Sequence, residues 1–200
     1  MEKKKNTLYF ITGNIHKFHE ISKLFSRAKT SYSLERKQVE LVEIQATNIK
    51  EVALFKLNSI KGDINGSYFI EDAGFFVDKP LNGFPGVYSS YVMKTIGNKG
   101  ILRLIDNFDE TQAHFTTVIA VYFKPLDQNL VFEGSIYGKI SNTPRGSGGF
   151  GFDPIFIPDI IPNKTFAELT IEEKNKISHR GKAWSKFISF LKTTQKLTRA

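Results

Sequence analysis

The sequence predicts an α/β protein built on a mixed β-sheet with helices on its faces. Short, wholly apolar runs at residues 8–11 and 67–70 are typical of strands buried on both sides. Helical patterns follow and separate these runs, which is the order expected of parallel strands joined by helices. A β-prone stretch at 113–123, a turn region and a second stretch at 130–140 predict a hairpin, which adds antiparallel strands to the same sheet.

Two helices are predicted in the first third of the chain. The turn 12–14 leads into a helix that carries apolar residues on one side over 18–25. Residues 33–44 are expected to be extended, because β-branched and apolar residues are interspersed with charged ones there. A second helix is predicted after Asn48, because Glu51 three residues later completes the pattern of an N-cap and its partner.

The strand at 67–70 runs directly into Glu71 and Asp72, which we therefore expect at its carboxyl end. A loop rich in Gly and Pro over 79–86 precedes two short helical patterns, around Val92 and over 101–105. These short helices are expected to lead into the hairpin.

The last quarter of the chain is predicted to be mostly helical. A glycine-dense stretch, 143–153, is followed by a short strand at 155–157. Thr170 and Glu173 form the pattern of a capping box, which predicts a short helix. Ser178 is the predicted cap of the final helix, whose apolar side carries Trp184, Phe187, Ile188 and Leu191.

Composition narrows the classes of function. The chain has 200 residues and no Cys, which excludes disulfides, thiolate metal sites and cysteine nucleophiles. The apolar run at 8–11 is too short for a signal peptide, and no run reaches membrane-spanning length, so we expect a cytoplasmic protein with no membrane partner.

The net charge of +8 lies mostly at the two ends of the chain. Residues 1–5 carry +2 and residues 182–200 carry +5, which leaves +1 for the body. Terminal basic residues are typical of solvated ends, so the charge alone does not predict a nucleic-acid partner. No repeat or linker-like stretch interrupts the chain, so we expect one domain over 1–200, with the basic ends 1–5 and 192–200 as candidates for disorder.

The stretch Thr12-Gly13-Asn14-Ile15-His16-Lys17 is a candidate phosphate site. It lies between a buried strand and a helix N-terminus, where free backbone N–H groups and the helix dipole favour an anion. Lys17 adds a positive charge one turn into the helix. The spacing is not that of a Walker loop or a dinucleotide-binding turn, and the same residues would also make an ordinary capping turn.

Three acidic residues are candidates for metal binding or proton transfer. Glu71 and Asp72 are adjacent on the predicted strand, so their side chains should point to opposite faces and only one of them should reach a site. Glu43 ends the preceding extended segment. Carboxylates that converge beside a phosphate site usually hold Mg²⁺, although a single acid at a strand end is more often solvated.

Two further stretches carry aromatic and cationic side chains. Phe150-Gly151-Phe152-Asp153 lies in the glycine-dense segment and could stack on a base, or could equally be a flexible loop with its rings tucked into the core. His179 and Arg180 lie in the first turn of the final helix, where the helix dipole mildly opposes a cation.

Taken together, these stretches resemble the inosine triphosphate pyrophosphatase family of non-canonical purine NTP pyrophosphohydrolases. The resemblance covers most of the chain, from Thr12 to Ala183. Two positions depart from the family: Phe152 stands where Tyr or Trp is often found, and Ala73 where Ser or Thr is common. The four stretches, in the family's order, are Thr12–Lys17 (TGNxxK), Glu71–Tyr88 (EDAG…PGVY), Gly149–Phe156 (GFGFDPIF) and Thr165–Ala183 (TFAEL…EEKNKISHRGKA).

The resemblance implies a fold, a reaction and a cofactor. It implies an elongated sheet with two lobes and a nucleotide cleft between them, and usually a homodimer. The implied reaction is hydrolysis of ITP, dITP or XTP to the monophosphate and pyrophosphate by metal-activated water. The implied cofactor is Mg²⁺, with Mn²⁺ as a substitute, and the implied role is to keep deaminated purines out of nucleic acids.

The resemblance also implies roles for individual residues. Asp72 is expected to be the base that takes a proton from water, and Glu43 and Asp72 to be the metal ligands. The residues expected to bind the substrate are Thr12, Gly13, Asn14, Ile15, His16, Lys17, Lys56, Ala73, Phe150, Gly151, Phe152, Asp153, Lys174, His179 and Arg180.

Two other functions remain open from the residues alone. A nucleic-acid-binding module would use the basic ends, bind with a steep salt dependence and release no pyrophosphate. A nucleotide-binding regulator would keep the pocket but not the chemistry, and the presence of Asp72, Glu43 and Lys17 argues against it.

Overall fold

The computed structural model describes residues 6–197, and within them the predicted mixed sheet is confirmed. Seven strands form one sheet in the order β2-β1-β3-β5-β6-β7, with β4 paired to β3. The strands are β1 (Asn6–Ile11), β2 (Tyr32–Lys37), β3 (Ser67–Lys79), β4 (Phe84–Gly86), β5 (Gln112–Phe123), β6 (Gln128–Ile140) and β7 (Phe156–Pro158).

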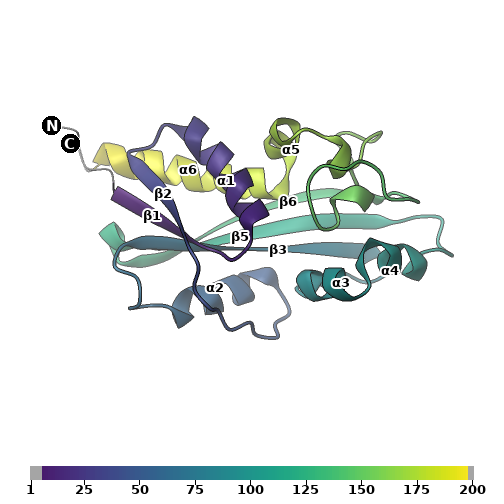
Figure 1. Cartoon of the computed structure of the whole chain (residues 1–200), viewed down its shortest axis with the longest axis horizontal. Helices are drawn as coiled ribbons and strands as arrows, with labels where there is room; N and C mark the ends of the chain where they lie inside the picture. The colour runs from purple at the N-terminus through teal and green to yellow at the C-terminus, as the bar shows by residue number, and fades with distance from the viewer. Residues whose placement is uncertain (1–5, 198–200) are drawn as a thin grey trace.

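The sheet is mixed because its first strands are parallel and its later ones are antiparallel. β1 pairs in parallel with both β2 and β3, whereas β5 pairs antiparallel with β3 and β6. β3, β5 and β6 each have twelve or thirteen residues, and they give the molecule its length (Figure 1).

Helices cover both faces of this sheet. The helices are α1 (Ile15–Ala28), α2 (Ile49–Ser59), α3 (Ser89–Thr95), α4 (Gly97–Leu104), α5 (Ile171–Ile177) and α6 (His179–Leu197), with 3₁₀ turns at Lys124–Leu126, Asp153–Ile155 and Phe166–Glu168. α1, α5 and α6 lie on one side of the long strands, and α2, α3 and α4 lie on the other (Figure 1). Among the described residues, no helix is apolar enough over a sufficient length to span a bilayer.

The predicted capping residues are confirmed. The side chain of Asn48 accepts a hydrogen bond from the Glu51 amide at the start of α2. Thr170 and Glu173 form a reciprocal capping box at α5, and the Ser178 hydroxyl accepts from the Gly181 amide at the start of α6. Local chemistry therefore sets the start of these helices.

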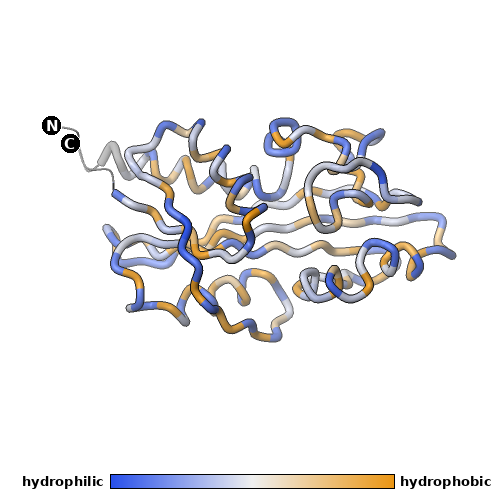
Figure 2. The backbone as a smooth tube through the Cα atoms, viewed as in Figure 1, coloured by the Kyte–Doolittle hydropathy of each residue, from blue (hydrophilic) through white to orange (hydrophobic). Residues whose placement is uncertain are grey.

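Apolar side chains gather into cores at the two ends of the sheet. At one end, α1 and α6 pack around Phe69 and Trp184 on one face, and α2 packs around Leu57 on the other. At the far end, Phe75 and Phe115 pack with the segment 152–169. Figure 2 shows the hydrophobic residues running along the central strands between these ends.

Three elements differ from the prediction. The loop predicted over 79–86 contains the short strand β4, because residues 84–86 pair antiparallel with β3. The extended segment predicted over 33–44 is a strand only as far as Lys37, because β1, its partner, ends at Ile11, which pairs with Lys37. The strand predicted over 67–70 continues to Lys79, because β5 pairs with it along its whole length after β1 has ended. Glu71 and Asp72 therefore lie within β3 and not at its end.

The predicted disorder of the basic ends falls partly outside the described residues. Residues 192–197 are described as the last turns of α6, and the disorder of the basic ends stays a prediction. Residues 1–5 and 198–200 lie outside the described part of the chain.

Candidate active site

The candidate site lies beside the end of β1, at the point where its neighbour β3 continues without it. The parallel pairing of β1 with β3 is recorded through Phe10 and Phe69, and the chain then turns at 12–14 into α1. The next two residues of β3 after Ile70 are Glu71 and Asp72. As expected from strand geometry, they face opposite sides: Glu71 contacts Lys17 and Arg180 from α1 and α6, whereas Asp72 contacts Lys56 from α2.

The loop 12–14 is ordered by its own side chains. The Thr12 hydroxyl accepts a hydrogen bond from the Asn14 amide, and Asn14 Oδ1 accepts from the His16 and Lys17 amides. The sequence predicts free amides at this helix end, but Asn14 caps two of them. An anion bound here would therefore depend more on the charge of Lys17 than on the capped amides. The space beside Gly13 is open, because a Cβ there would meet no atom within 4 Å, so a ligand could approach the backbone closely.

Lys17 is held against β3. Its ammonium lies 2.7 Å from Glu71 Oε2 and donates at 3.0 Å to the Glu71 carbonyl oxygen. That carbonyl belongs to the peptide that leads into Asp72. The lysine predicted to bind phosphate therefore reaches the same point of the sheet as the predicted base.

Glu43 and Asp72 converge on one ammonium group. Lys56 Nζ donates at 2.8 Å to Glu43 Oε1 and at 2.9 Å to Asp72 Oδ1. Lys56 is only 5% exposed, and burial alone would lower its pKa, but the two carboxylates raise the pKa above its ordinary value. The hydrogen bond from Lys56 holds the pKa of Glu43 below its usual range.

The same two carboxylates fit a small, hard cation. The second oxygen of Asp72, Oδ2, is buried and has no hydrogen-bond partner among the described residues. No group of three or more metal-ligating side chains occurs in the described part of the chain. One or two carboxylates are nevertheless a typical protein contribution to Mg²⁺, because substrate phosphates and water complete its ligands.

The Phe150 ring lies beside one histidine ring and two cationic side chains. It lies 5.5 Å from the His16 ring in a stacked arrangement, 5.1 Å from Lys174 Nζ and 5.4 Å from the Arg180 guanidinium. These groups come from three separate segments of the chain. The structure thus brings the start of α1, the glycine-dense loop and the α5–α6 region to one place, as the motifs predicted.

The loop that carries Phe150 is fixed by Asp153. Its carboxylate accepts from the Phe150 amide at 2.8 Å and from Lys174 Nζ at 2.6 Å. Burial raises the pKa of Asp153, and the Lys174 ammonium opposes this shift. Gly149 has a φ of +68°, and a Cβ there would collide with the same carboxylate, so the turn requires glycine.

Phe152 and His179 lie in the apolar core and not beside Phe150. Phe152 stacks on Phe75 at 4.8 Å, and His179 stacks on Phe115 at 4.7 Å. Burial first, and the neighbouring cations second, lower the pKa of His179 well below its ordinary value, so its ring is neutral at pH 7. Their predicted contacts with a base remain predictions.

Ala73 and Gly151, also predicted to bind substrate, flank these groups. Ala73 is half-buried in β3 and lies opposite Thr117 of β5. The Gly151 carbonyl accepts a hydrogen bond from Asn98 in α4 at 3.1 Å. Gly151 is therefore tied to the far end of the molecule.

Glu20 is the functional candidate that sequence reasoning missed. It lies on α1, is 4% exposed, and accepts hydrogen bonds from Lys174 Nζ at 2.9 Å and from Arg180 Nη1 at 2.5 Å. The available signal was its position: an acid three residues after Lys17, on the apolar side of a helix, needs a buried partner.

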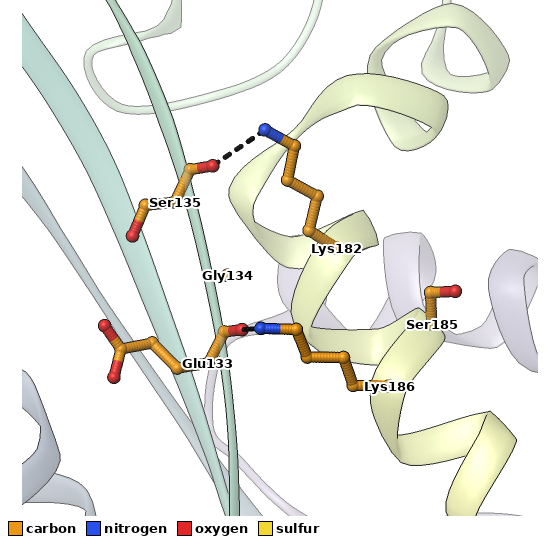
Figure 3. Close-up of a pocket in the computed structure, with 6 residues that line it drawn as sticks. All are labelled: Glu133, Gly134, Ser135, Lys182, Ser185 and Lys186. Atoms are coloured by element: carbon orange, nitrogen blue, oxygen red, sulfur yellow. Dashed lines mark hydrogen bonds between the residues drawn. The ribbon is translucent and has the colours of Figure 1, made fainter.

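Two hollows in the surface are lined by none of the predicted site residues. One of about 640 Å³ lies between β6 and α6 and is lined by Glu133, Gly134, Ser135, Lys182, Ser185 and Lys186 (Figure 3). Another of about 930 Å³ lies at the far end, beside Phe108 and Lys139. The nucleotide cleft implied by the resemblance is therefore not one of these two hollows.

Known proteins match the chain over nearly its full length. The model of the Ham1 family matches residues 8–190. A dITP/XTP pyrophosphatase of Thermococcus kodakarensis is 46% identical over 94% of this chain and 99% of its own, and one of Pyrococcus horikoshii is 44% identical over 94% and 98%. The solved structure of the Staphylococcus aureus Ham1 protein has a TM-score of 0.79 at 27% identity and covers 94% of this chain and 99% of its own. The chain is therefore a member of the Ham1 family.

Proposed function

We propose that this protein hydrolyses non-canonical purine nucleoside triphosphates, such as dITP, ITP and XTP, to the monophosphate and pyrophosphate. Relatives that are 40–46% identical over most of the chain are named dITP/XTP pyrophosphatases. The observation that carries the proposal is that a phosphate-loop lysine, Lys17, meets β3 at the peptide that precedes Asp72, beside the carboxylate of Glu43.

We propose that Mg²⁺, or Mn²⁺ in its place, is the cofactor. Glu43 and Asp72 would hold it, because they already converge on one positive charge and Asp72 Oδ2 has no other partner among the described residues. When bound, the ion would polarise water and neutralise charge on the phosphates. Lys56 would then give up part of its contact with these two carboxylates.

The residues of the chain suit an attack by water on the α-phosphorus. The oxygen of water forms the new bond to phosphorus, and the bond from the α-phosphorus to the bridging oxygen breaks. Asp72 takes the proton from water, and pyrophosphate leaves with the electron pair of the broken bond. Lys17 lies where it can meet the negative charge that grows on the leaving group.

The cations around Phe150 suit recognition of a 6-oxopurine. Hypoxanthine and xanthine present a 6-oxo acceptor, whereas adenine presents a 6-amino donor. Arg180 has five N–H donors, and three of them bond to Glu20 and Glu71, which leaves two for a base. A donor that meets a donor is disfavoured, so adenine would be rejected.

We propose that the protein acts in the cytoplasm as a homodimer and that it removes deaminated purines from the nucleotide pool. A light-scattering mass of twice the chain mass would support the dimer, and the mass of one chain at micromolar concentration would exclude it.

The decisive experiment measures pyrophosphate release from dITP, XTP, dATP and dGTP, with Mg²⁺ and with EDTA. We expect release from dITP and XTP only, and only with the metal. Lys23→Ala is a matched control, because Lys23 lies on α1 and makes a single exposed ion pair. Binding of dITP without release would favour a regulator, and salt-sensitive binding of DNA or RNA without release would favour a nucleic-acid module.

A further inference from the structure

Glu71 is a buried acid to which the mechanism above gives no task. Its side chain has no exposed surface. Oε2 lies 2.7 Å from Lys17 Nζ, and Oε1 accepts from Arg180 Nε at 3.1 Å and from the Thr117 hydroxyl at 3.1 Å. Both oxygens of one carboxylate are thus shared between groups from α1, α6 and β5.

The two cations on Glu71 belong to opposite ends of the proposed substrate. Lys17 follows the phosphate loop, and Arg180 lies beside the ring of Phe150, 5.4 Å from its centre. No other described carboxylate is recorded in an ion pair with both of them. Glu20, the other acid on Arg180, pairs with Lys174 instead.

The peptide of Glu71 adds a second contact to the same lysine. β1 ends at Ile11, so no β1 residue is recorded opposite Glu71. Lys17 Nζ fills that position and donates to the Glu71 carbonyl oxygen at 3.0 Å. The lysine is therefore oriented by two oxygen atoms of the same residue.

Charge keeps this arrangement in place. Burial by itself would raise the pKa of Glu71, but Arg180 and then Lys17 lower it to about 2. The carboxylate is therefore ionised at neutral pH, and it competes with a phosphate for Lys17. The ion pair with Lys17 and the charge-assisted hydrogen bond from Arg180 Nε together fix the direction of both cations.

We propose that Glu71 is a positioning residue that couples the two ends of the site. One carboxylate orients Lys17 for the phosphates and Arg180 for the base, so a base that engages Arg180 alters the hold on Lys17. The inference rests on the proposed function, because it assigns the two cations to the two ends of a nucleotide.

The test uses Glu71→Gln, with Glu35→Gln as the control. Glu35 is an exposed acid on β2 that forms no ion pair with either cation in the described part of the chain. For Glu71→Gln we expect kcat for dITP to fall about ten- to a hundredfold, the effect of one charge-assisted hydrogen bond. KM should stay level or fall, because the competitor for Lys17 is gone, and the dITP-over-dATP ratio of kcat/KM should fall at least about fivefold. The control should match the wild type.

A double-mutant cycle isolates the coupling. Lys17→Ala should cost at least about tenfold less in kcat in the Glu71→Gln background than in the wild type. Losses that multiply independently, with an unchanged dITP-over-dATP ratio, would overturn the proposal. If Glu71→Gln does not fold, Thr117→Val removes one hydrogen bond from the same carboxylate. It should lower the dITP-over-dATP ratio in the same direction, and an unchanged ratio would again overturn the proposal.

A binding measurement separates this proposal from the proposed function. In the wild type, saturating pyrophosphate should change the calorimetric affinity for dIMP at least about fivefold, and in Glu71→Gln it should not. If the wild-type protein binds pyrophosphate and dIMP but hydrolyses no triphosphate, the proposed function fails. The effect of one ligand on the affinity for the other would still be measurable. If the two ligands bind independently in the wild type, the coupling fails whatever the enzyme hydrolyses.

Discussion

Asp72 differs from the other acids of the site because one of its oxygen atoms, Oδ2, is buried with neither a hydrogen bond nor an ion pair among the described residues. Glu71 Oε2 also lacks a hydrogen bond, but it lies 2.7 Å from the Lys17 ammonium. The other oxygen of Asp72 is already bonded to Lys56. A buried oxygen atom without a partner lowers the stability of the folded protein unless it binds a cation or accepts a hydrogen bond from water. This cost, together with the neighbouring Lys17, marks Asp72 as the reactive acid.

We therefore expect Asp72→Asn to lower pyrophosphate release from dITP by at least about a thousandfold, because an amide neither holds a hard cation well nor accepts a proton. Thermal unfolding should show that the fold persists. Asp78→Asn, six residues further along β3 and paired with His114 at 2.8 Å, is the control and should retain activity. Turnover of Asp72→Asn within tenfold of the wild type at saturating Mg²⁺ would exclude the assigned role.

Phe150 should contribute binding without selectivity. Stacking on a base is worth about 1–3 kcal/mol and does not depend strongly on which base it is. Phe150→Ala should therefore raise KM about ten- to a hundredfold for dITP, XTP and dATP alike. Tyr91→Ala, which truncates an aromatic ring that is 69% exposed, should leave all three unchanged. A loss confined to one nucleotide would show that Phe150 reads the base edge.

Residues that act on their near neighbours were predictable from the sequence. Asn48, Thr170 and Ser178 each cap a helix only a few residues away, and each was predicted. The pairing of Arg180 with Glu20 was not, because 160 residues separate the two and only the packing of α1 against α6 brings them together. The sequence pointed to the cations at the base end, and to Glu71 and Asp153, but not to Glu20, which pairs with both Lys174 and Arg180.

At the scale of elements, β6 and α6 are unusually close. The close approach of the two elements depends on Gly134 of β6. A Cβ at this position would collide with the His179 carbonyl and the Ala183 amide of α6. The first turn of α6 carries Arg180, so the contact at Gly134 also sets how far that arginine reaches. The glycine was visible in the sequence, but its partner element was not.

Gly134→Ala should lower the free energy of unfolding by about 3 kcal/mol or more, since the added methyl meets backbone on both sides. Gly13→Ala is the matched control for stability, because a Cβ there meets nothing within 4 Å. Urea denaturation measures both variants. Equal stabilities would mean that α6 can shift outward without cost.

The length of a strand depends on its pairing partner, which is why the length of β3 could not be predicted from its own residues. The apolar run at 67–70 predicted a short buried strand, whereas β3 has thirteen residues. Its second half alternates Phe75 and Val77, which face the far core, with residues on the other side. That alternation can also be read as an ordinary loop with apolar residues until β5 is known to run alongside.

At the scale of the whole molecule, α6 also protects the free edge of the sheet. β7 covers only the last three residues of β6, 138–140. Further back, Lys182 donates to the Ser135 carbonyl at 2.9 Å and Lys186 to the Glu133 carbonyl at 2.7 Å (Figure 3). Two of the basic residues that dominate the charge of the C-terminal end are thus engaged with the sheet, where they oppose pairing with another strand.

The whole fold should lose stability in acid in a way that depends on Glu71. Its pKa is about 2 in the folded protein, against an ordinary value of 4.5. The folded state therefore binds fewer protons than the unfolded state between these values, and the stabilisation present above pH 4.5 is lost as the pH falls towards 2. The difference corresponds to about 3 kcal/mol. Urea denaturation at pH 7, 4.5 and 3 should show a smaller decline for Glu71→Gln, and equal declines would contradict the shift.

The alternation of Glu71 and Asp72 along β3 also limits how the gene can change. One inserted or deleted codon between Ser67 and Glu71 would reverse the facing of the residues on one side of the change. Asp72 would then turn towards Lys17 and Arg180, and Glu71 towards Lys56. Insertions can therefore accumulate in the loops at either end of β3. The number of residues within the strand must stay the same, because it decides which face Glu71 and Asp72 point to.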